Sequence, residues 1–312
     1  MRIDAVLCTY DRADKLGHAI ESALTAAAPF DSDVKIIVVD NNSTDDTKQV
    51  VEHYVSRSGG KVVYLFEPEQ GRHHALNRGI AHSTAGIVAF FDDDETLDSN
   101  WFDVIAACFA DPTVDYIGGP YHPNWSMAPP AWLPKKYNGA IGVIQNGPER
   151  RRYDTDGFNA MPVGGNLAIR RTVLDRCGPY SSSYMYSEDR YMHEQLISIG
   201  AIGYYIPELS IHHHIPKHRL QKGYYRVWAA TEGRNRGKMD RERRQNKTVL
   251  LGAPPWMWRE LVDSSLTWLT ARLGRGADTS EAFTAELNVR QFVNFYTARN
   301  LPFIKERYRK RA

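Results

Sequence analysis

The sequence predicts an α/β protein with a mostly parallel central sheet, helices on both faces and a helical appendage at the C-terminal end. Along the first 92 residues, short apolar runs alternate with segments in which apolar residues recur every three or four positions. The apolar runs show no polar alternation, so both faces of these strands are expected to be buried. The 312 residues are 42% hydrophobic and 24% charged, which is typical of a globular protein and excludes a disordered or fibrous one.

The elements follow one another in the order strand, helix, strand. Four strands are predicted, at residues 3–8, 34–39 (VKIIVV), 62–66 and 87–91 (IVAFF). Between them, helical spacing of apolar residues predicts a helix over 15–25, and Ser43 followed by Asp46 is typical of a helix start. A third helix is predicted over 71–82.

Polar residues follow three of these strands where each one ends. They are Thr9-Tyr10-Asp11, Asp40-Asn41-Asn42 and Asp92-Asp93-Asp94. Parallel strands bring their carboxyl ends to one edge of the sheet, where α/β proteins bind ligands. We therefore expect the three polar clusters to lie together. The first loop, CTYDRAD, has neither a dinucleotide-binding glycine pattern nor a phosphate-binding P-loop, which disfavours both of those enzyme classes.

The acidic run at residues 92–94 predicts a cation site. Three adjacent carboxylates repel one another unless a cation lies among them, and oxygen ligands suit Mg²⁺ or Mn²⁺. Such ions usually take one or two carboxylates and complete their shell with phosphate and water, so a metal-bound diphosphate is the expected ligand. A surface acidic loop that caps a helix is the alternative reading of this run.

The rest of the composition narrows the functional class. The net charge is +2, so the chain is no general binder of polyanions, and a nucleic-acid partner is not expected. Cys8, Cys108 and Cys177 show neither disulfide nor zinc spacing. With no apolar signal segment and no uninterrupted apolar span, the expected location is the cytoplasm, either free or peripheral at the inner membrane face.

Five segments in order resemble the inverting, metal-dependent glycosyltransferases of family 2, which use nucleotide-sugar donors and have the GT-A fold. The segments are AVLCTYDR, IIVVDNNSTDDT, GRHHALNRGIAHSTAGIVAFFDDDE, GGNLAIRR and SEDRYMHEQLISIGAIGYYIPELSIHHHIPKHRL. The resemblance covers residues 3–235. It implies transfer of one sugar from a UDP- or GDP-sugar to a hydroxyl group of a glycan, a lipid-linked or a small-molecule acceptor, as in polysaccharide biosynthesis.

The resemblance implies a nucleotide site at the ends of the first strands. Thr9 and Tyr10 would flank the base, Asp40 would hydrogen-bond the base or ribose, and Arg72 would contact diphosphate or base. An ordinary charge at a helix start is the alternative reading of Arg72.

For the acidic run, the resemblance pairs Asp92 with ribose or sugar hydroxyl groups and Asp94 with the metal, and Asp93 is left between these roles. Asp92 and His213 are the further metal ligands expected. A mixed Asp and His site would favour Mn²⁺ over Mg²⁺.

The resemblance also implies an acceptor side to the site. Gly165 and Asn166 would line the donor-sugar pocket, and Asp189 would be the base that removes the proton from the acceptor. Glu188 would orient the acceptor or support the loop. Taken alone, the Glu188-Asp189 pair also fits a helix start, where carboxylates are stabilised.

We expect a catalytic domain over residues 1–235, with its nucleotide-binding half at 1–118 and its acceptor half at 119–235. A basic linker is expected over 236–255, because residues 217–247 hold eleven Lys and Arg but three Asp and Glu. A helical appendage is expected over 256–312. The appendage has an apolar helical face at 258–273 and a second helix over 281–296. We expect its helices to pack on the catalytic domain, to form a homodimer contact or to contact a membrane peripherally.

Two other functions remain open from the residues alone. A sugar-phosphate nucleotidyltransferase is also an α/β protein with metal-binding carboxylates, although it normally has a glycine-rich basic loop after the first strand. A carbohydrate-binding protein without catalysis is the third, but it has no need of an acidic run and a separate Glu-Asp pair. The released product distinguishes the three: nucleoside diphosphate, pyrophosphate or neither.

Overall fold

The computed structural model divides the chain into two units, and each is described by itself. Unit 1 comprises residues 1–124 and 142–214, and unit 2 comprises residues 125–141 and 215–312. The structure describes residues 1–30, 33–155, 157–158, 160–181, 188–243, 248–274 and 279–301. The division after residue 214 differs from the expected boundary at 235.

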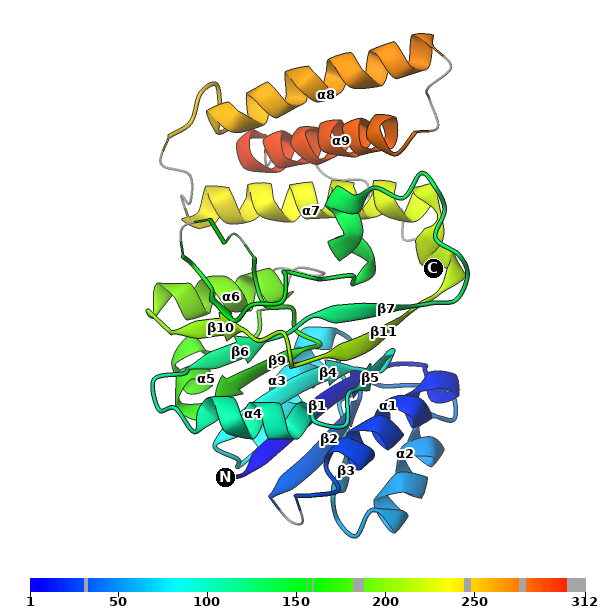
Figure 1. Cartoon of the computed structure of the whole chain (residues 1–312), viewed down its shortest axis with the longest axis vertical. Coiled ribbons are helices and arrows are strands. Elements are labelled where there is room, and N and C mark those ends of the chain that lie inside the picture. The colour runs from blue at the N-terminus through cyan, green and yellow to red at the C-terminus, as the bar shows by residue number, and fades with distance from the viewer. Residues whose placement is uncertain are drawn as a thin grey trace. The chain divides into compact units, whose positions relative to one another are not determined.

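The larger sheet of unit 1 has eight strands among the described residues (Figure 1). One half contains four parallel strands in the order β3 (Val62–Phe66), β2 (Val34–Asp40), β1 (Ile3–Thr9) and β4 (Ile87–Asp92). The other half continues with β9 (Leu167–Arg170), β6 (Tyr116–Gly118), β10 (Gly203–Tyr205) and β8 (Arg151–Arg152). β9 is antiparallel to both of its neighbours, β4 and β6, so β6 runs in the same direction as β4. The sheet is therefore mostly parallel, as predicted.

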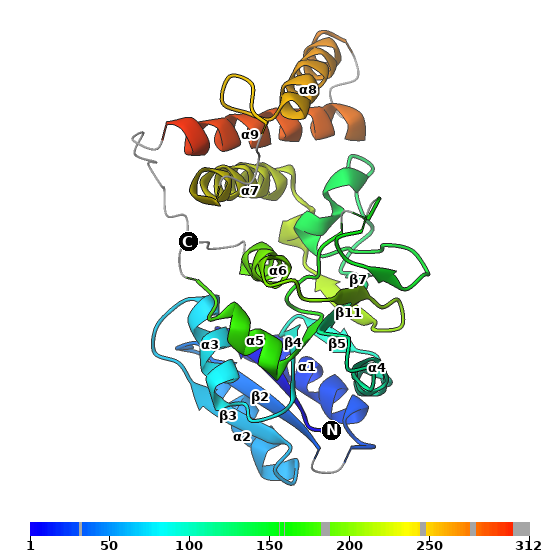
Figure 2. The ribbon, with the colours of Figure 1, turned by 90° about the vertical axis from the view of Figure 1, so that its left-hand side faces the viewer.

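Helices cover both faces of this sheet. One face packs against α1 (Ala13–Ala26), α2 (Thr47–Arg57) and α4 (Trp101–Phe109). The other face packs against α3 (Arg72–His82), α5 (Arg171–Cys177) and α6 (Glu188–Ser198). Figure 2 shows α3 and α5 on one side of the strands and α1 and α4 on the other. Neighbouring residues of β1 divide between the two cores, with Ala5 and Leu7 in the first and Val6 in the second. This explains why the strands are apolar throughout.

A second sheet of three strands begins directly after the acidic run. Its order is β5 (Glu95–Leu97), β11 (Ile211–Ile215) and β7 (Tyr121–Trp125), and His213 on β11 lies opposite Glu95 on the antiparallel β5. Ile211, His213 and Ile215 are buried whereas His212 is exposed, which follows from the alternation of side chains along a strand. Only two residues separate β4 from β5, so the acidic run lies where the two sheets meet.

Unit 2 consists mainly of helices. They are α7 (Lys222–Arg243), α8 (Pro255–Leu273) and α9 (Ser280–Asn300), with short 3₁₀ helices η1 (Lys135–Ile141) and η3 (Lys217–Leu220). The predicted basic linker over 236–255 is wrong for residues 236–243, which continue α7. In that stretch Met239 and Asp240 are buried, and Asp240 forms an ion pair with Arg299 of α9. Packing on α9 therefore overrides the charged, solvated character that the composition indicated.

Two glycines bring α7 and α9 into close contact. A Cβ atom at Gly233 would overlap the backbone oxygen of Gln291, and one at Gly237 would overlap that of Phe295. The two helices touch along their backbones at these points, and a longer side chain would have to push them apart.

We expect Gly237→Leu to destabilise the protein by about 1–3 kcal/mol, because the added side chain overpacks this contact. The midpoint of denaturant unfolding, followed by circular dichroism, measures the change. Gly223→Leu on the same helix is the matched control, since nothing lies within 4 Å of its Cβ position. Equal midpoints for the two variants would show that the close contact does not matter for stability.

Candidate active site

The three polar clusters predicted at the strand ends do lie together. Thr9 at the end of β1 is in register with Asp40 at the end of β2, and Cys8 is in register with Asp92 at the end of β4. The Thr9 hydroxyl donates a hydrogen bond to Oδ2 of Asp93 over 2.8 Å, which links the first loop to the acidic run. The edge of the sheet therefore presents these groups as one surface.

Tyr10 and Asp40 differ in how they are exposed at this edge. Tyr10 is 46% exposed, so its ring is available for stacking. Asp40 is buried, and its carboxylate accepts hydrogen bonds from the backbone N–H of Ser43 and the hydroxyl of Tyr64, both at 2.9 Å. These two bonds fix the orientation of the Asp40 carboxylate and leave further lone pairs for a ligand.

Arg72 joins the acidic run to the Glu188-Asp189 pair. Its Nη2 lies 2.7 Å from Oδ1 of Asp92, and its Nη1 lies 3.4 Å from Oδ1 of Asp189. Burial opposes the charge, but the carboxylates of Asp92, Asp189 and Glu188 raise the pKa of Arg72 well above its ordinary value. The guanidinium group at the start of α3 thus connects carboxylates that lie 97 positions apart in the sequence.

Asp189 is the second residue of α6, and its carboxylate lies against the backbone of Gly164. Burial raises the pKa of Asp189, and Asp92 adds to this, whereas Arg72 and the Gly164 N–H favour the ionised form. A carboxylate whose pKa is raised accepts a proton more readily near neutral pH. Glu188, in the first position of α6, is also buried.

The glycine pair Gly164-Gly165 allows these carboxylates to approach the backbone. A Cβ atom at Gly164 would overlap Oδ1 of Asp189. At Gly165 it would overlap Oε1 of Glu95 and lie 2.8 Å from Oδ2 of Asp92. The absence of side chains at both positions is therefore a requirement of this arrangement.

The structure does not support a direct contact between Asn166 and a sugar. Its side chain is fully buried, and Oδ1 accepts a hydrogen bond from the Trp101 indole at 2.9 Å. Its Nδ2 donates to the backbone oxygens of Pro120 and Leu209 at 3.1 and 2.7 Å. Asn166 instead positions the adjacent glycine pair, because its amide already hydrogen-bonds at both ends within the core.

Glu95 is a site residue that the sequence analysis missed. It is buried, its Oε2 accepts a hydrogen bond from the Asp92 N–H at 2.8 Å, and it lies against Gly165. Burial, together with Asp92 and Asp94, raises the pKa of Glu95 well above its ordinary value. The sequence feature that could have indicated it is its position directly after three aspartates, where β5 begins with an inward-facing residue.

Asp93 faces the first loop. Burial raises the pKa of Asp93 to about 6; the Arg12 guanidinium opposes this shift and Asp94 adds to it. With its Oδ2 bound by Thr9, this carboxylate lies toward the nucleotide edge predicted from β1.

Asp94 and His213 form the part of the site that suits a metal ion. Oδ1 of Asp94 lies 3.5 Å from Nε2 of His213, and both side chains are less than 10% exposed. No three His, Cys, Asp or Glu side chains converge as a metal cage among the residues that the structure describes. Asp92, predicted as a further ligand, is instead bound by Arg72. An ion that takes its other ligands from a diphosphate and water needs only one or two protein ligands, so the Asp94–His213 pair fits.

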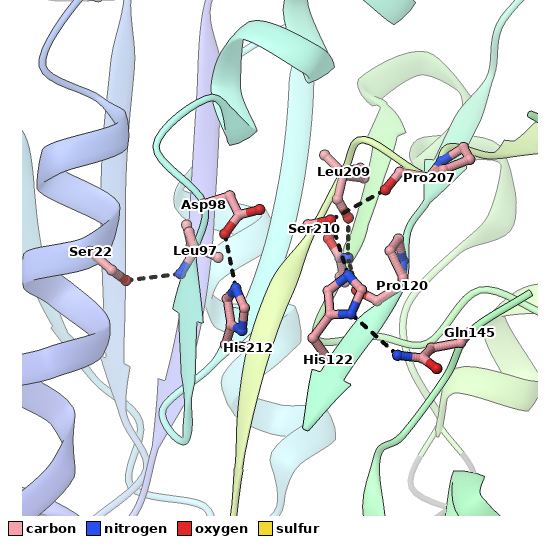
Figure 3. Close-up of polar contacts among 11 residues, drawn as sticks. Ser22, Leu97, Asp98, Pro120, His122, Gln145, Pro207, Leu209, Ser210 and His212 are labelled. Carbon is pink, nitrogen blue, oxygen red and sulfur yellow. Dashed lines mark hydrogen bonds and ion pairs between the residues drawn. The ribbon is translucent and has the colours of Figure 1, made fainter. Parts of the chain in front are cut away.

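Strand alternation selects His213 from three adjacent histidines. His212, on the opposite face of β11, turns to Asp98 with 3.1 Å between Nε2 and Oδ1, as Figure 3 shows. On β7, His122 lies between Ser210 and Gln145 at 3.3 Å from each (Figure 3). These contacts stabilise the outer face of the small sheet, away from Asp94.

Sequence comparison identifies the relatives of the chain. The profile described as Glycosyl transferase family 2 matches residues 4–178, more than half of the chain. An uncharacterized glycosyltransferase of Nostoc is 32% identical over 186 residues, which are 57% of this chain and 54% of that protein. The glucosyl-dolichyl phosphate glucuronosyltransferase of Haloferax volcanii is 22% identical over 204 residues, 64% of this chain and 63% of that protein. The matches thus span less than two thirds of these two relatives.

Structure comparison gives the same fold. A mannosyltransferase from Pyrobaculum calidifontis, solved in complex with GDP-Man and Mn²⁺, matches with a TM-score of 0.66. The two are 17% identical, and the match covers 97% of this chain and 88% of the other. The predicted GT-A fold is confirmed.

Proposed function

The chain belongs to glycosyl transferase family 2, and on that basis we propose that it transfers a single sugar from a nucleoside-diphosphate sugar to an acceptor hydroxyl group, inverting the anomeric centre. The observation that carries this proposal is the bridge made by Arg72. One guanidinium group contacts both Asp92, at the nucleotide edge of the sheet, and Asp189, at the start of α6. A donor-binding carboxylate and a base therefore lie within the reach of one side chain.

In the proposed reaction, Asp189 is the general base. It removes the proton from the acceptor hydroxyl as that oxygen bonds to the anomeric carbon, and the bond from this carbon to the diphosphate breaks. The raised pKa of Asp189 and its position against the backbone of Gly164 both suit a proton acceptor. Displacement from the opposite face needs one base and no covalent nucleophile.

Asp94 and His213 are the residues that would hold a divalent ion, with Mn²⁺ favoured by the mixed ligands. Bound there, the ion would neutralise charge on the departing diphosphate. Thr9, Tyr10, Asp40 and Asp93 would hold the nucleoside part of the donor. The GDP-Man and Mn²⁺ bound to the Pyrobaculum mannosyltransferase support this class of donor and cofactor.

We assign a lipid-linked or glycan hydroxyl as the acceptor. The Haloferax relative, whose name specifies a dolichyl phosphate-linked sugar, supports the lipid-linked class.

A screen of UDP- and GDP-sugars with Mn²⁺ or Mg²⁺ tests the proposal. Slow hydrolysis of the correct donor is expected to release free nucleoside diphosphate even without the acceptor. Release of pyrophosphate from a sugar phosphate and a nucleoside triphosphate would identify a nucleotidyltransferase instead. Carbohydrate binding without any turnover of a nucleotide sugar would exclude both enzymes.

We expect Gly164→Ala to lower turnover about a hundredfold while the protein stays folded, because the new Cβ displaces the Asp189 carboxylate. Nucleoside diphosphate release measures the effect. Gly86→Ala, an exposed position with nothing within 4 Å of its Cβ, is the matched control and should keep full turnover. If both variants turn over alike, the fit of Asp189 against Gly164 is not needed for the reaction.

A further inference from the structure

One surface of unit 2 exposes an unusual number of apolar side chains. On α8 they recur at spacings of four, three and four residues, and a turn just before the helix adds two more. All are at least half exposed: Leu250, Leu251, Val262, Leu266, Leu269 and Leu273. We call these six residues the α8 patch.

The helix that carries the patch is apolar on two faces. One face packs on α9, where Met257 is buried and Trp258 and Leu261 contact the cluster around Phe292. Figure 1 shows α9 between α7 and α8 within unit 2. The second apolar face, formed by Val262, Leu266, Leu269 and Leu273, is at least half exposed and so is not covered by α9. A helix that is apolar on both faces normally has a partner on each.

The turn at Leu251 is built to expose leucine. Leu251 has φ +47° and Gly252 has φ +80°, and Leu250 and Ala253 pair across the turn through hydrogen bonds of 2.8 and 3.1 Å. A leucine in the left-handed region is disfavoured, so the fold maintains it against a conformational cost. The Trp258 indole donates to the Leu250 oxygen at 2.7 Å, and the Gly252 oxygen accepts from Arg299 and Asn300 at the end of α9, which fixes the turn where α8 begins.

The net charge of unit 2 favours an anionic partner for the patch. Over the sequence, unit 2 holds 23 Lys and Arg against 9 Asp and Glu, a net charge of +14, whereas unit 1 holds 16 against 28, a net charge of −12. An apolar helix face on a strongly basic unit is complementary to an anionic lipid surface. A second copy of the chain would bring two units of the same sign together, and the stripe on α8 spans only two heptads.

Two tryptophans of α8 lie next to arginines of unit 2. Arg272 lies over the Trp268 ring at 4.6 Å, and Arg236 lies over the half-exposed Trp256 ring at 5.9 Å. Paired tryptophan and arginine side chains suit the headgroup level of a bilayer, where one end is apolar and the other is wet. No helix that the structure describes is both long and apolar enough to cross a bilayer.

We propose that the α8 patch docks unit 2 on an anionic lipid bilayer, with α8 lying in the plane of the interface and the Leu250-Leu251 turn inserted beside it. The proposal is independent of the proposed sugar transfer, because it concerns binding alone.

Flotation of the full chain with phosphatidylcholine vesicles, with and without phosphatidylglycerol, tests the proposal. We expect binding only to the vesicles that contain phosphatidylglycerol, weakened by added salt. The double variant Leu266→Glu/Leu269→Glu should bind at least tenfold less. Val227→Glu on α7, an apolar and exposed position outside the patch, is the matched control and should bind like the wild type.

Donor hydrolysis and thermal unfolding establish that each variant remains folded. No flotation of the wild type with phosphatidylglycerol vesicles would overturn the proposal, as would equal flotation of the double variant and the wild type. Sedimentation equilibrium tests the alternative occupant, a second copy of the chain. If the wild type forms a dimer, the double variant does not, and neither binds vesicles, the patch is a dimer contact.

Discussion

Replacing Asp189 by asparagine is expected to lower transfer by about 10²–10⁴-fold while donor binding remains, because general-base catalysis typically contributes this much. Asparagine has nearly the same shape as aspartate, but its amide cannot take the acceptor proton. Turnover is measured as nucleoside diphosphate release in the presence of acceptor, and donor affinity by calorimetry.

Asp175→Asn is the matched control for this change. Asp175 forms an ion pair with Arg171 on the surface of α5 at 2.7 Å, so the variant loses a carboxylate of the same kind outside the site. It should keep wild-type turnover. Near-full turnover in Asp189→Asn would show that Asp189 is not the base and would make Glu188 the candidate for that role.

Replacing Asp94 by alanine is expected to weaken metal-dependent donor binding at least about a hundredfold. The carboxylate is one of two side chains assigned to the ion, and a metal contributes several kcal/mol to holding a diphosphate, where 1.4 kcal/mol corresponds to a factor of ten. Calorimetric titration of the donor with and without Mn²⁺ measures the loss, which should vanish when no metal is added.

His213→Ala should reproduce this loss, and His212→Ala is its matched control. The two histidines are neighbours in sequence, but His212 turns to Asp98 on the other face of β11. An equal effect of the two substitutions would mean that His213 does not serve the ion. A donor affinity of Asp94→Ala that still responds to Mn²⁺ as the wild type does would place the ion elsewhere.

The sequence predicted the nucleotide half of the fold because its signals are local. The strands at 62–66 and 87–91 are apolar on both faces, and the rule for parallel sheets brings Thr9, Asp40 and Asp92 to one edge. That convergence needed no long-range information beyond strand direction.

The parts that escaped prediction depend on contacts between distant segments. Ser43 looked like a helix start, but α2 begins at Thr47 and the Ser43 hydroxyl accepts from the Asp11 N–H instead. Asn166 was expected to line the donor-sugar pocket because its segment resembles the one that does so in the family. Its partners come from segments 43 to 65 positions away, which no local pattern reveals.

The end of α7 was missed for a similar reason. Residues 236–243 are mostly charged, and composition indicated a solvated linker. The stabilising contacts of this stretch are the close approach at Gly237 and the buried Asp240 with its partner Arg299 on α9. Both depend on a helix that follows some 40 positions later.

The row of three histidines on β11 makes the strand's register a matter of packing alone. A slip by one residue would bring His212 or His214 beside Asp94 with the same imidazole chemistry, so binding of an ion would not by itself favour the correct register. Ile211 and Ile215 do favour it, because both are fully buried and the slip would expose them to solvent. Exposing each isoleucine would cost roughly 1.5–3 kcal/mol of folding free energy, so the burial of these two side chains determines which histidine lies at the site.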